Sequence, residues 1–542
     1  MSLRYCYIAA ALAFLCFGSC KEKQRAGDKS VFHINLVGGL ESLDPAFAKD
    51  LSTMWCAHAI YNTLVETDSS LHLAPCLATH WVVSDDALTY TFFLRDDVYF
   101  QDHELFPGGK GRKMTAHDVV YSFNRLIDPA IASTGAWIFN GRVAEKDPFV
   151  AVNDTTVQIR LSSPFRPLPE ILSMPYCSIV PKEVAMHYGK DFRSHPCGTG
   201  PFRFHYWDEG NVLVLHKNPN SWQRDGNGRQ LPYVDAVQFS FFDNKATEFL
   251  LFLQGKLDFV NGVDGSFKDL VLTRKGTLKP EYEKKIALQK NVYLNTEYLG
   301  FNIDSANPVV RNSPTNNVLI RQAINYAIDR QKMVTYFKNG MGIPATGGLT
   351  PPGMAGFDTL AGYGYHYDPA KSLALLKKAG YPNGRGLPPI KIITPDNFAD
   401  LVNFVAGQLQ DVGIRLEVEN MQPAIIKEQM AKNQAVFFRG QWIADYPDAE
   451  TYLAVFDSRL PSPPNYTRFN NKQFDAWYDA SMKEQDTVRR SLYRKMDSLA
   501  ISYAPVVPLY YDQRMHFLQT QVRGFSSNPM NIIDLKQVYF KK

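Results

Sequence analysis

The chain has 542 residues, with 58 Lys and Arg against 54 Asp and Glu, which gives a formal net charge of only +4. A chain of this length is too long for one hydrophobic core, so two or three domains are expected. The charge is spread along the sequence and forms no basic stripe, which excludes nucleic acid from the expected partners.

The N-terminus has the pattern of a secretory signal. A short positive start precedes an apolar run that is too short to span a bilayer. Small residues then precede Cys20, an order that resembles a bacterial lipobox, in which the cysteine is lipidated. We expect a signal peptide at 1–19 and a lipidated tether at 20–30, which would anchor the exported protein to a bacterial membrane. An ordinary signal with a chance cysteine is the alternative.

The first part of the chain is rich in strand patterns. In chain order the sequence predicts a strand at 31–37, a helix at 57–65, a strand pair at 81–84 and 88–95, a helix after Thr115 and a strand at 155–161. Thr115 is the expected N-cap of its helix, which should end before Pro129.

The pattern changes further along the chain. The stretch HPCGTGPFRF predicts a tight turn, followed by a strand that begins at Phe202. Further elements are expected as strands at 211–219 and 234–242, a helix and then a strand within 246–260, helices at 320–337 and 370–380, and strands at 390–395 and 414–420. Gly380 is placed where a C-cap glycine belongs. Helices that alternate with strands predict an α/β fold.

Four cysteines remain once the signal and Cys20 are set aside: Cys56, Cys76, Cys177 and Cys197. An even number in an exported protein permits two disulfides, in three possible pairings. Buried free thiols are the alternative. The spacing fits no zinc pattern.

The stretch WIADYPDAE places Asp445, Asp448 and Glu450 within six residues. These acids lack the alternating ligand positions and the glycine of a calcium loop, so no metal is expected. The chain has no GxSxG or HExxH motif and no nucleophile paired with a base. We therefore expect no catalytic residue and no cofactor.

Eight stretches together resemble the family 5 extracellular solute-binding proteins, the oligopeptide- and dipeptide-binding lipoproteins or periplasmic receptors of ABC importers. They run in the family's order over nearly the whole mature chain: LAPCLATHWVVSDDALTYTFFLRDDVYFQD, TAHDVVYSFNRLIDP, CGTGPFRF, VLHKNPNSW, IRQAINYAIDR, LLKKAGYPNG, WIADYPDAE and PVVPLYY. The resemblance implies an α/β, two-lobed periplasmic-binding-protein fold of type II with mixed sheets.

The resemblance also implies how the chain divides into domains. An extra domain, the inserted domain, would interrupt the first lobe, and hinge crossings would fall near Gly300 and Arg514. The expected ranges are 31–72, 196–299 and 514–542 for the first lobe, 73–195 for the inserted domain and 300–513 for the second lobe. Lobes of this kind close around a ligand by a hinge motion.

The same resemblance suggests ligand contacts near the three acids. In peptide-binding relatives the aspartate of the W-x-x-D motif pairs with the ligand's α-ammonium group, and here that residue is Asp445. A turn or cap residue is the alternative. Trp442 and Tyr446 are expected to line the cleft, with core packing as the alternative for Trp442. Asp448 and Glu450 are expected at a helix start.

Two further candidates lie elsewhere in the sequence. Arg439 has the spacing of an arginine that meets ligand carboxylates in some relatives, and a structural arginine is the alternative. The turn formed by Gly198, Thr199 and Gly200 lies near the cleft in relatives. Its residues are candidate ligand contacts, but we favour a role in the fold.

The function implied by the resemblance is capture of peptides in an interlobe cleft and delivery to the permease of an ABC transporter. We expect a monomer, exported and facing the periplasm or the cell exterior. The alternatives are a receptor of the same fold for a nickel chelate, haem, a sugar or an opine, and a peptide sensor without transport.

Overall fold

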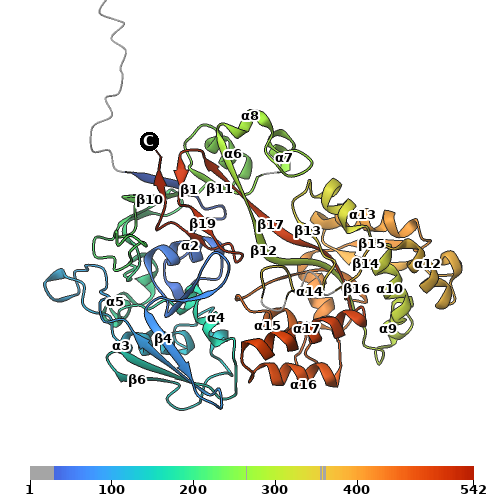
Figure 1. Ribbon diagram of the computed structural model, residues 1–542, viewed down its shortest axis with the longest axis horizontal. Helices are drawn as coiled ribbons and strands as arrows, with labels where there is room; N and C mark the ends of the chain where they lie inside the picture. Colours follow the sequence, from blue (N-terminus) through green and yellow to red (C-terminus); the bar gives the residue numbers. More distant parts are fainter. Residues whose placement is uncertain (1–29, 264, 355–356, 358–361, 542) are drawn as a thin grey trace, which may run out of the picture.

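The computed structural model describes residues 30–263, 265–354, 357 and 362–541 (Figure 1). The predicted signal peptide and nearly all of the predicted tether, including Cys20, lie outside the described residues. Within the described part of the chain, no helix is both long enough and apolar enough to cross a membrane.

A mixed sheet of 11 strands runs through the molecule. In spatial order its strands are β15 (Leu416–Asn420), β14 (Ile390–Thr394), β16 (Phe437–Ile443), β12 (Ile286–Phe301), β17 (Val506–Gln519), β11 (Phe259–Asn261), β1 (Val31–Asn35), β10 (Ala236–Ser240), β9 (Val212–Lys217) and β8 (Phe202–Asp208), and β13 (Ile343–Pro344) pairs with β17. The strands predicted at 31–37, 211–219, 234–242, 390–395 and 414–420 are confirmed, as is the strand start at Phe202.

The two long strands β12 and β17 connect the two halves of this sheet (Figure 1). They pair antiparallel, and their register breaks between Val292 and Thr296. From Asn295 onward β12 also pairs with β16 of the second lobe. The chain therefore changes from one half of the sheet to the other a few residues before Gly300 and beside Arg514, and the lobe boundaries stay a prediction.

Helix α2 (Leu51–Ile60) shows that the predicted helix at 57–65 is wrong at both ends. Asp50 begins the helix earlier, because its side chain accepts the backbone N–H of Thr53 at 2.9 Å. Tyr61 is extended, with φ −118° and ψ 171°, and ends the helix. The chain then forms the short antiparallel pair β2 (Val65–Thr67) and β3 (Leu73–Pro75).

Residues 73–195, predicted as the inserted domain, contain a separate antiparallel sheet. Its strands, in spatial order, are β4 (Ala78–Val83), β5 (Thr89–Leu94), β7 (Thr156–Arg160) and β6 (Phe149–Asn153), and the helices of these residues are α3 (Ala116–Ile127), α4 (Leu168–Leu172) and α5 (Lys182–Tyr188). The predicted strand pair, the helix with Thr115 as N-cap and the strand at 155–161 are confirmed.

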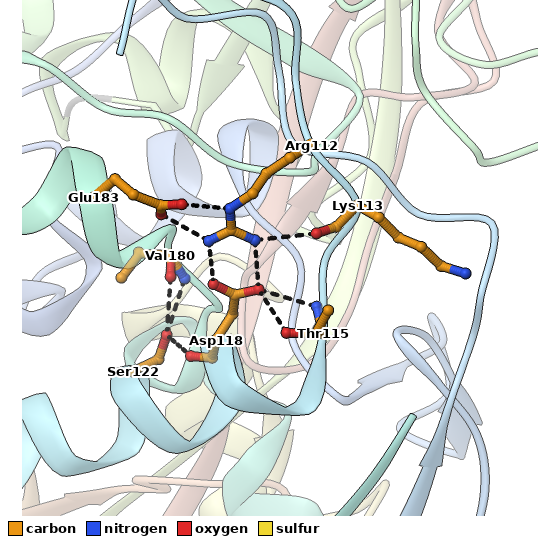
Figure 2. A network of polar contacts seen from close by, with 7 residues as sticks. All are labelled: Arg112, Lys113, Thr115, Asp118, Ser122, Val180 and Glu183. Atoms are coloured by element: carbon orange, nitrogen blue, oxygen red, sulfur yellow. Dashed lines mark hydrogen bonds and ion pairs between the residues drawn. The ribbon is translucent and has the colours of Figure 1, made fainter. Parts of the chain in front are cut away.

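Arg112 fastens α3 to α5 in the inserted domain (Figure 2). Its Nη1 and Nη2 donate to the two carboxylate oxygens of Asp118 at 2.8 and 2.6 Å. Its Nε and Nη2 donate to Glu183 at 2.5 and 2.7 Å. Asp118 also accepts the backbone N–H of Thr115 at 2.9 Å. One planar guanidinium thus bridges two carboxylates on different helices, a geometry that a lysine could not reproduce.

The structure has two helices where the sequence predicts one helix at 320–337. Helix α10 (Val318–Ala327) ends at Ala327. A second, short helix, α11 (Arg330–Lys332), begins after Asp329. Asp329 caps it by accepting the N–H of Lys332 at 2.8 Å. Buried Arg330 donates to the carbonyl of Pro508 at 2.6 Å, which fixes the break. The amphipathic pattern continues across both helices, so periodicity alone misses the break.

The other helices cover the sheet or join its strands. They are α6 (Lys245–Leu253), α7 (Gly265–Val271), α8 (Pro280–Glu283), α9 (Pro308–Arg311), α12 (Pro369–Lys378), α13 (Ala399–Gln410), α14 (Pro423–Ala431), α15 (Glu450–Leu453), α16 (Lys472–Ser481) and α17 (Asp486–Ser502). Gly380 follows α12 with φ +95°, as expected of a C-cap glycine. Near the C-terminus lie the two-residue strands β18 (Val522–Arg523), β19 (Ser526–Ser527), β20 (Ile533–Asp534) and β21 (Tyr539–Phe540).

All four cysteines of the described residues are buried free thiols, so the structure takes the second of the two alternatives. Burial raises the pKa of Cys56, Cys76 and Cys177, and it raises that of Cys197 to about 12. These thiols therefore stay protonated and pack as small apolar groups.

Candidate functional site

A cavity of about 680 Å³ lies between residues 137–165, in the predicted inserted domain, and residues 442–483, in the predicted second lobe. Its lining includes Trp442, Asp445 and Tyr446 from the predicted site. Trp137 and Arg142 line it from the inserted domain. Its size falls within the roughly 300–1,000 Å³ of small-molecule sites. A second cavity, of about 410 Å³, contains none of the predicted site residues.

The segment that carries Asp445 leaves the sheet at the end of β16. Its first residue, Ala444, donates its N–H to the carbonyl of Leu294 on β12 at 2.9 Å. Asp448 then accepts the N–H of Glu450 at 2.8 Å, at the start of α15. These two attachments hold the intervening residues at the cavity wall.

Asp445 is exposed to the cavity. Within the described chain, the carboxylate and the backbone N–H of Asp445 form hydrogen bonds only with Thr451 Oγ1, and both bonds are long, at 3.4 Å. Asp445 forms no ion pair with any described residue. Burial by the surrounding protein raises the pKa of Asp445, while Thr451 and Arg142 lower it. Asp445 thus offers a carboxylate that lacks a cationic partner.

The other two acids of the segment, Asp448 and Glu450, already have protein partners. Asp448 is 1 % exposed, accepts from Tyr493 Oη at 2.8 Å and lies 3.2 Å from Nη1 of Arg489. Glu450 accepts from Tyr478, and burial raises the pKa of Glu450. Both stand at the start of α15, as predicted. No group of three or more His, Cys, Asp or Glu among the described residues is placed to hold a metal ion.

Aromatic side chains from both sides form the walls of the cavity. Trp442 is half-buried on β16, and its Nε1 lies 3.5 Å from Thr451 Oγ1. Tyr446 is 3 % exposed and stacks with Trp137, with ring centroids 6.4 Å apart at an angle of 26°. The Trp137 and Arg142 wall was missed by sequence reasoning, because these residues belong to no motif and lie about 300 residues from Asp445.

Arg439 points into a different environment. Its Nη2 and Nε donate to the carboxylate of Glu297 at 2.6 and 2.5 Å, and Nη2 also donates to Gln441 at 2.7 Å. Its guanidinium carbon lies 3.3 Å from the ring centroid of Phe398. Burial raises the pKa of Glu297 to about 7, against the opposing effect of Arg439. Arg439 does not line the 680 Å³ cavity, and its role as a ligand contact stays a prediction.

The glycine turn packs against the end of α2. Gly200 donates its N–H to the carbonyl of Ile60 at 2.9 Å, and a Cβ on Gly200 would lie 2.5 Å from the Ile60 carbonyl carbon. Thr199 is 1 % exposed, and its hydroxyl donates to Asn62 Oδ1 at 3.0 Å. Gly198 accepts the N–H of Gln101 at 2.9 Å. None of the three lines the 680 Å³ cavity, and these contacts favour a role in the fold.

The predicted inserted domain contacts the predicted second lobe beside the cavity, where α4 lies next to α17 (Figure 1). Arg166 donates from Nε to the carbonyl of Lys483 at 2.9 Å. Arg489 on α17 donates to Glu170 on α4 at 3.2 Å. Burial and the nearby Asp448 raise the pKa of Glu170 to about 7, although Arg489 lowers it.

Known proteins resemble this chain over most of its length. The model of the bacterial extracellular solute-binding proteins, family 5, middle region, matches residues 72–462. The glutathione-binding protein GsiB of Escherichia coli O6:K15:H31 (strain 536 / UPEC) is 28% identical over 494 residues, which cover 89% of each chain.

Solved structures agree with this family match. HbpA2 from Haemophilus parasuis has a TM-score of 0.82 at 24% identity, covering 94% of this chain and 100% of that one. DppA from Helicobacter pylori, in complex with the peptide STSA, has a TM-score of 0.71 at 25% identity, covering 95% and 99%. These likenesses confirm the expected two-lobed α/β fold of periplasmic binding proteins.

Proposed function

Because this chain belongs to the bacterial extracellular solute-binding proteins of family 5, we propose that it captures short peptides in the 680 Å³ cavity and delivers them to the permease of an ABC importer. The observation that carries the proposal is the carboxylate of Asp445, which faces the cavity without a cationic partner among the described residues. A curated relative named for glutathione and a solved relative with a bound peptide support a peptide-like ligand.

Asp445 suits a peptide because every free peptide carries an α-ammonium group, whatever its side chains are. One carboxylate can therefore recognise many peptides. Such a pair is enclosed when the lobes close, and loss of one partner of an enclosed pair costs about 2–5 kcal/mol. The raised pKa of Asp445 fits this role, since an incoming cation would favour the ionised carboxylate.

The remaining walls suit varied side chains. Trp137 and Trp442 are half-buried, and each presents part of an aromatic ring to the cavity. Flat rings of this kind contact many apolar groups without selecting one of them. Bound water can complete the hydrogen bonds of the peptide main chain. We propose binding without catalysis, by a monomer that Cys20 anchors through lipid to the membrane.

Native mass spectrometry of the chain expressed without residues 1–20 tests this function. The expected result is a set of extra masses that match short peptides, and saturable binding of added peptides in titration calorimetry. A single discrete mass that is not a peptide, together with no binding of added peptides, would contradict the proposal. That outcome would favour a receptor for a nickel chelate, haem, a sugar or an opine.

A further inference from the structure

We propose that Arg142 of the inserted domain binds the ligand's carboxylate, so that the cavity takes zwitterionic short peptides held between Arg142 and Asp445. This inference rests on the proposed function of the same cavity. The sequence predicts that Arg439 binds the ligand's carboxylate, whereas this inference assigns that contact to Arg142, on the wall opposite Asp445.

Arg142 is held in place by neutral groups. Its Nη1 donates to the carbonyls of Trp137 and Ile138 at 2.6 and 3.2 Å. Its guanidinium carbon lies 4.8 Å from the ring centroid of Phe165 and 5.8 Å from that of Trp137. Within the described chain Arg142 forms no ion pair, and its Nε and Nη2 have no acceptor. A positioned guanidinium with two free donors suits bidentate binding of a carboxylate.

The other charged groups of the cavity are less suited to this role. Asp479 is paired with Arg459 at 2.7 Å, and Glu450 accepts from Tyr478. Lys483 also lines the cavity, but it is exposed, and a lysine offers a single charge on a flexible stem. Arg142 is therefore the cation whose geometry is already fixed.

Arg142 and Asp445 face the same cavity without touching. They lie beyond the 4.0 Å limit of an ion pair, yet Arg142 lowers the pKa of both Asp445 and Glu450. The cavity thus has a cationic wall on the inserted domain and an anionic wall on the second lobe. A ligand with one ammonium and one carboxylate would complement both walls and leave neither charge unpaired.

This arrangement also links binding to closure of the lobes. The two charged residues come from parts of the chain that approach each other across the cavity, so a zwitterion can contact both only when these parts are close together. A ligand shifts a conformational equilibrium only by its difference in affinity for the two states. A peptide with both free termini therefore stabilises the closed arrangement more than one with a single charged terminus.

The test compares trialanine with its C-terminal amide by titration calorimetry on wild type, Arg142→Gln and Lys483→Gln. We expect the amide to bind wild type at least about tenfold more weakly than the free acid, because it lacks the carboxylate. Arg142→Gln should bind acid and amide alike, whereas Lys483→Gln should keep the wild-type preference. Arg142→Lys, which keeps the charge but not the fork, should keep part of the preference and serves if Arg142→Gln does not fold.

The possible failures are distinguishable. If wild type binds neither form nor any other short peptide, the proposed function fails and the inference fails with it. If wild type binds acid and amide within about twofold of each other, the cavity does not recognise the carboxylate and only the inference is overturned. The inference is also overturned if the preference for the free acid survives in Arg142→Gln, and its loss in Lys483→Gln would then assign the carboxylate to Lys483.

Discussion

Arg439 on β16 and Glu297 on β12 form a bidentate ion pair inside the molecule, with Nη2 2.6 Å from Oε2 and Nε 2.5 Å from Oε1. Their side chains are only 8 % and 2 % exposed. We expect Arg439→Met to lower the free energy of unfolding by about 3–5 kcal/mol, because it leaves a buried carboxylate without its partner. Urea denaturation measures this loss.

The double variant Arg439→Met/Glu297→Leu is the matched control. It removes both charges, so it should recover much of the stability lost in the single variant. It should also retain the preference for peptides with a free C-terminus. Loss of that preference in the folded double variant would instead make Arg439 the ligand contact.

Asp445→Asn should weaken binding of free peptides by at least about tenfold and leave the fold intact, because the ligand's ammonium then lacks its charged partner. Titration calorimetry measures the affinity, and circular dichroism checks the fold. Asp479→Asn is the control, since Asp479 lines the same cavity but is paired with Arg459 at 2.7 Å. Equal affinities for wild type and Asp445→Asn would exclude Asp445 as the anchor.

Glu170 should make the protein less stable as the pH rises. Burial and Asp448 raise the pKa of Glu170 from 4.5 to about 7, so the folded state binds its proton more tightly than the unfolded state. The free energy of unfolding should therefore fall between pH 4.5 and pH 7, by up to about 3 kcal/mol. Denaturation across this range should show a larger fall in wild type than in Glu170→Gln, which keeps the similar contribution of Glu297. Parallel pH profiles would contradict it.

His516 should make the protein less stable as the pH falls. It is fully buried, Asn291 Nδ2 lies 3.3 Å from its Nδ1, and Asn531 Oδ1 lies 3.0 Å from its Nε2. Burial lowers the pKa of His516 from 6.5 to about 4. The unfolded state then binds the proton more tightly, so up to about 3 kcal/mol of stability should be lost as the pH falls from 6.5 to 4. His516→Gln should lack this acid-side loss, and an unchanged profile would refute the assignment.

Gly200→Ala tests whether the glycine turn serves the fold. Its new Cβ would lie 2.5 Å from the carbonyl carbon of Ile60, so we expect a loss of about 1–3 kcal/mol or more in the free energy of unfolding. Gly407→Ala is the control, because nothing lies within 4 Å of its Cβ position inside α13. It should stabilise the protein by about 0.5–1 kcal/mol. An unchanged free energy of unfolding in Gly200→Ala would show that the close packing of Gly200 against Ile60 is not required for the fold.

Local patterns predicted much of the fold. The strand at 31–37 rests on a short apolar run, and the helix after Thr115 rests on helical spacing and a capping residue. All of these signals are local in the sequence. The prediction of a helix at 57–65 is wrong because Asp50 caps the helix at an earlier position. The prediction of one helix at 320–337 is wrong because the apolar face continues across a break, which buried Arg330 fixes by its bond to distant Pro508.

The sequence by itself determined the family and the α/β class, and it predicted Asp445 in WIADYPDAE as a ligand contact, because these inferences rest on residues close together in the chain. Only the tertiary structure showed that the carboxylate of Asp445 faces the cavity without a cationic partner among the described residues. Asp448 is occupied by Arg489 and Tyr493, partners about 40 residues away, whereas Asp445 has only long bonds to Thr451. The tertiary structure also pairs Arg439 with buried Glu297 and places Arg142 on the cavity wall opposite Asp445. Such pairings arise when distant segments pack together, and no local pattern records them.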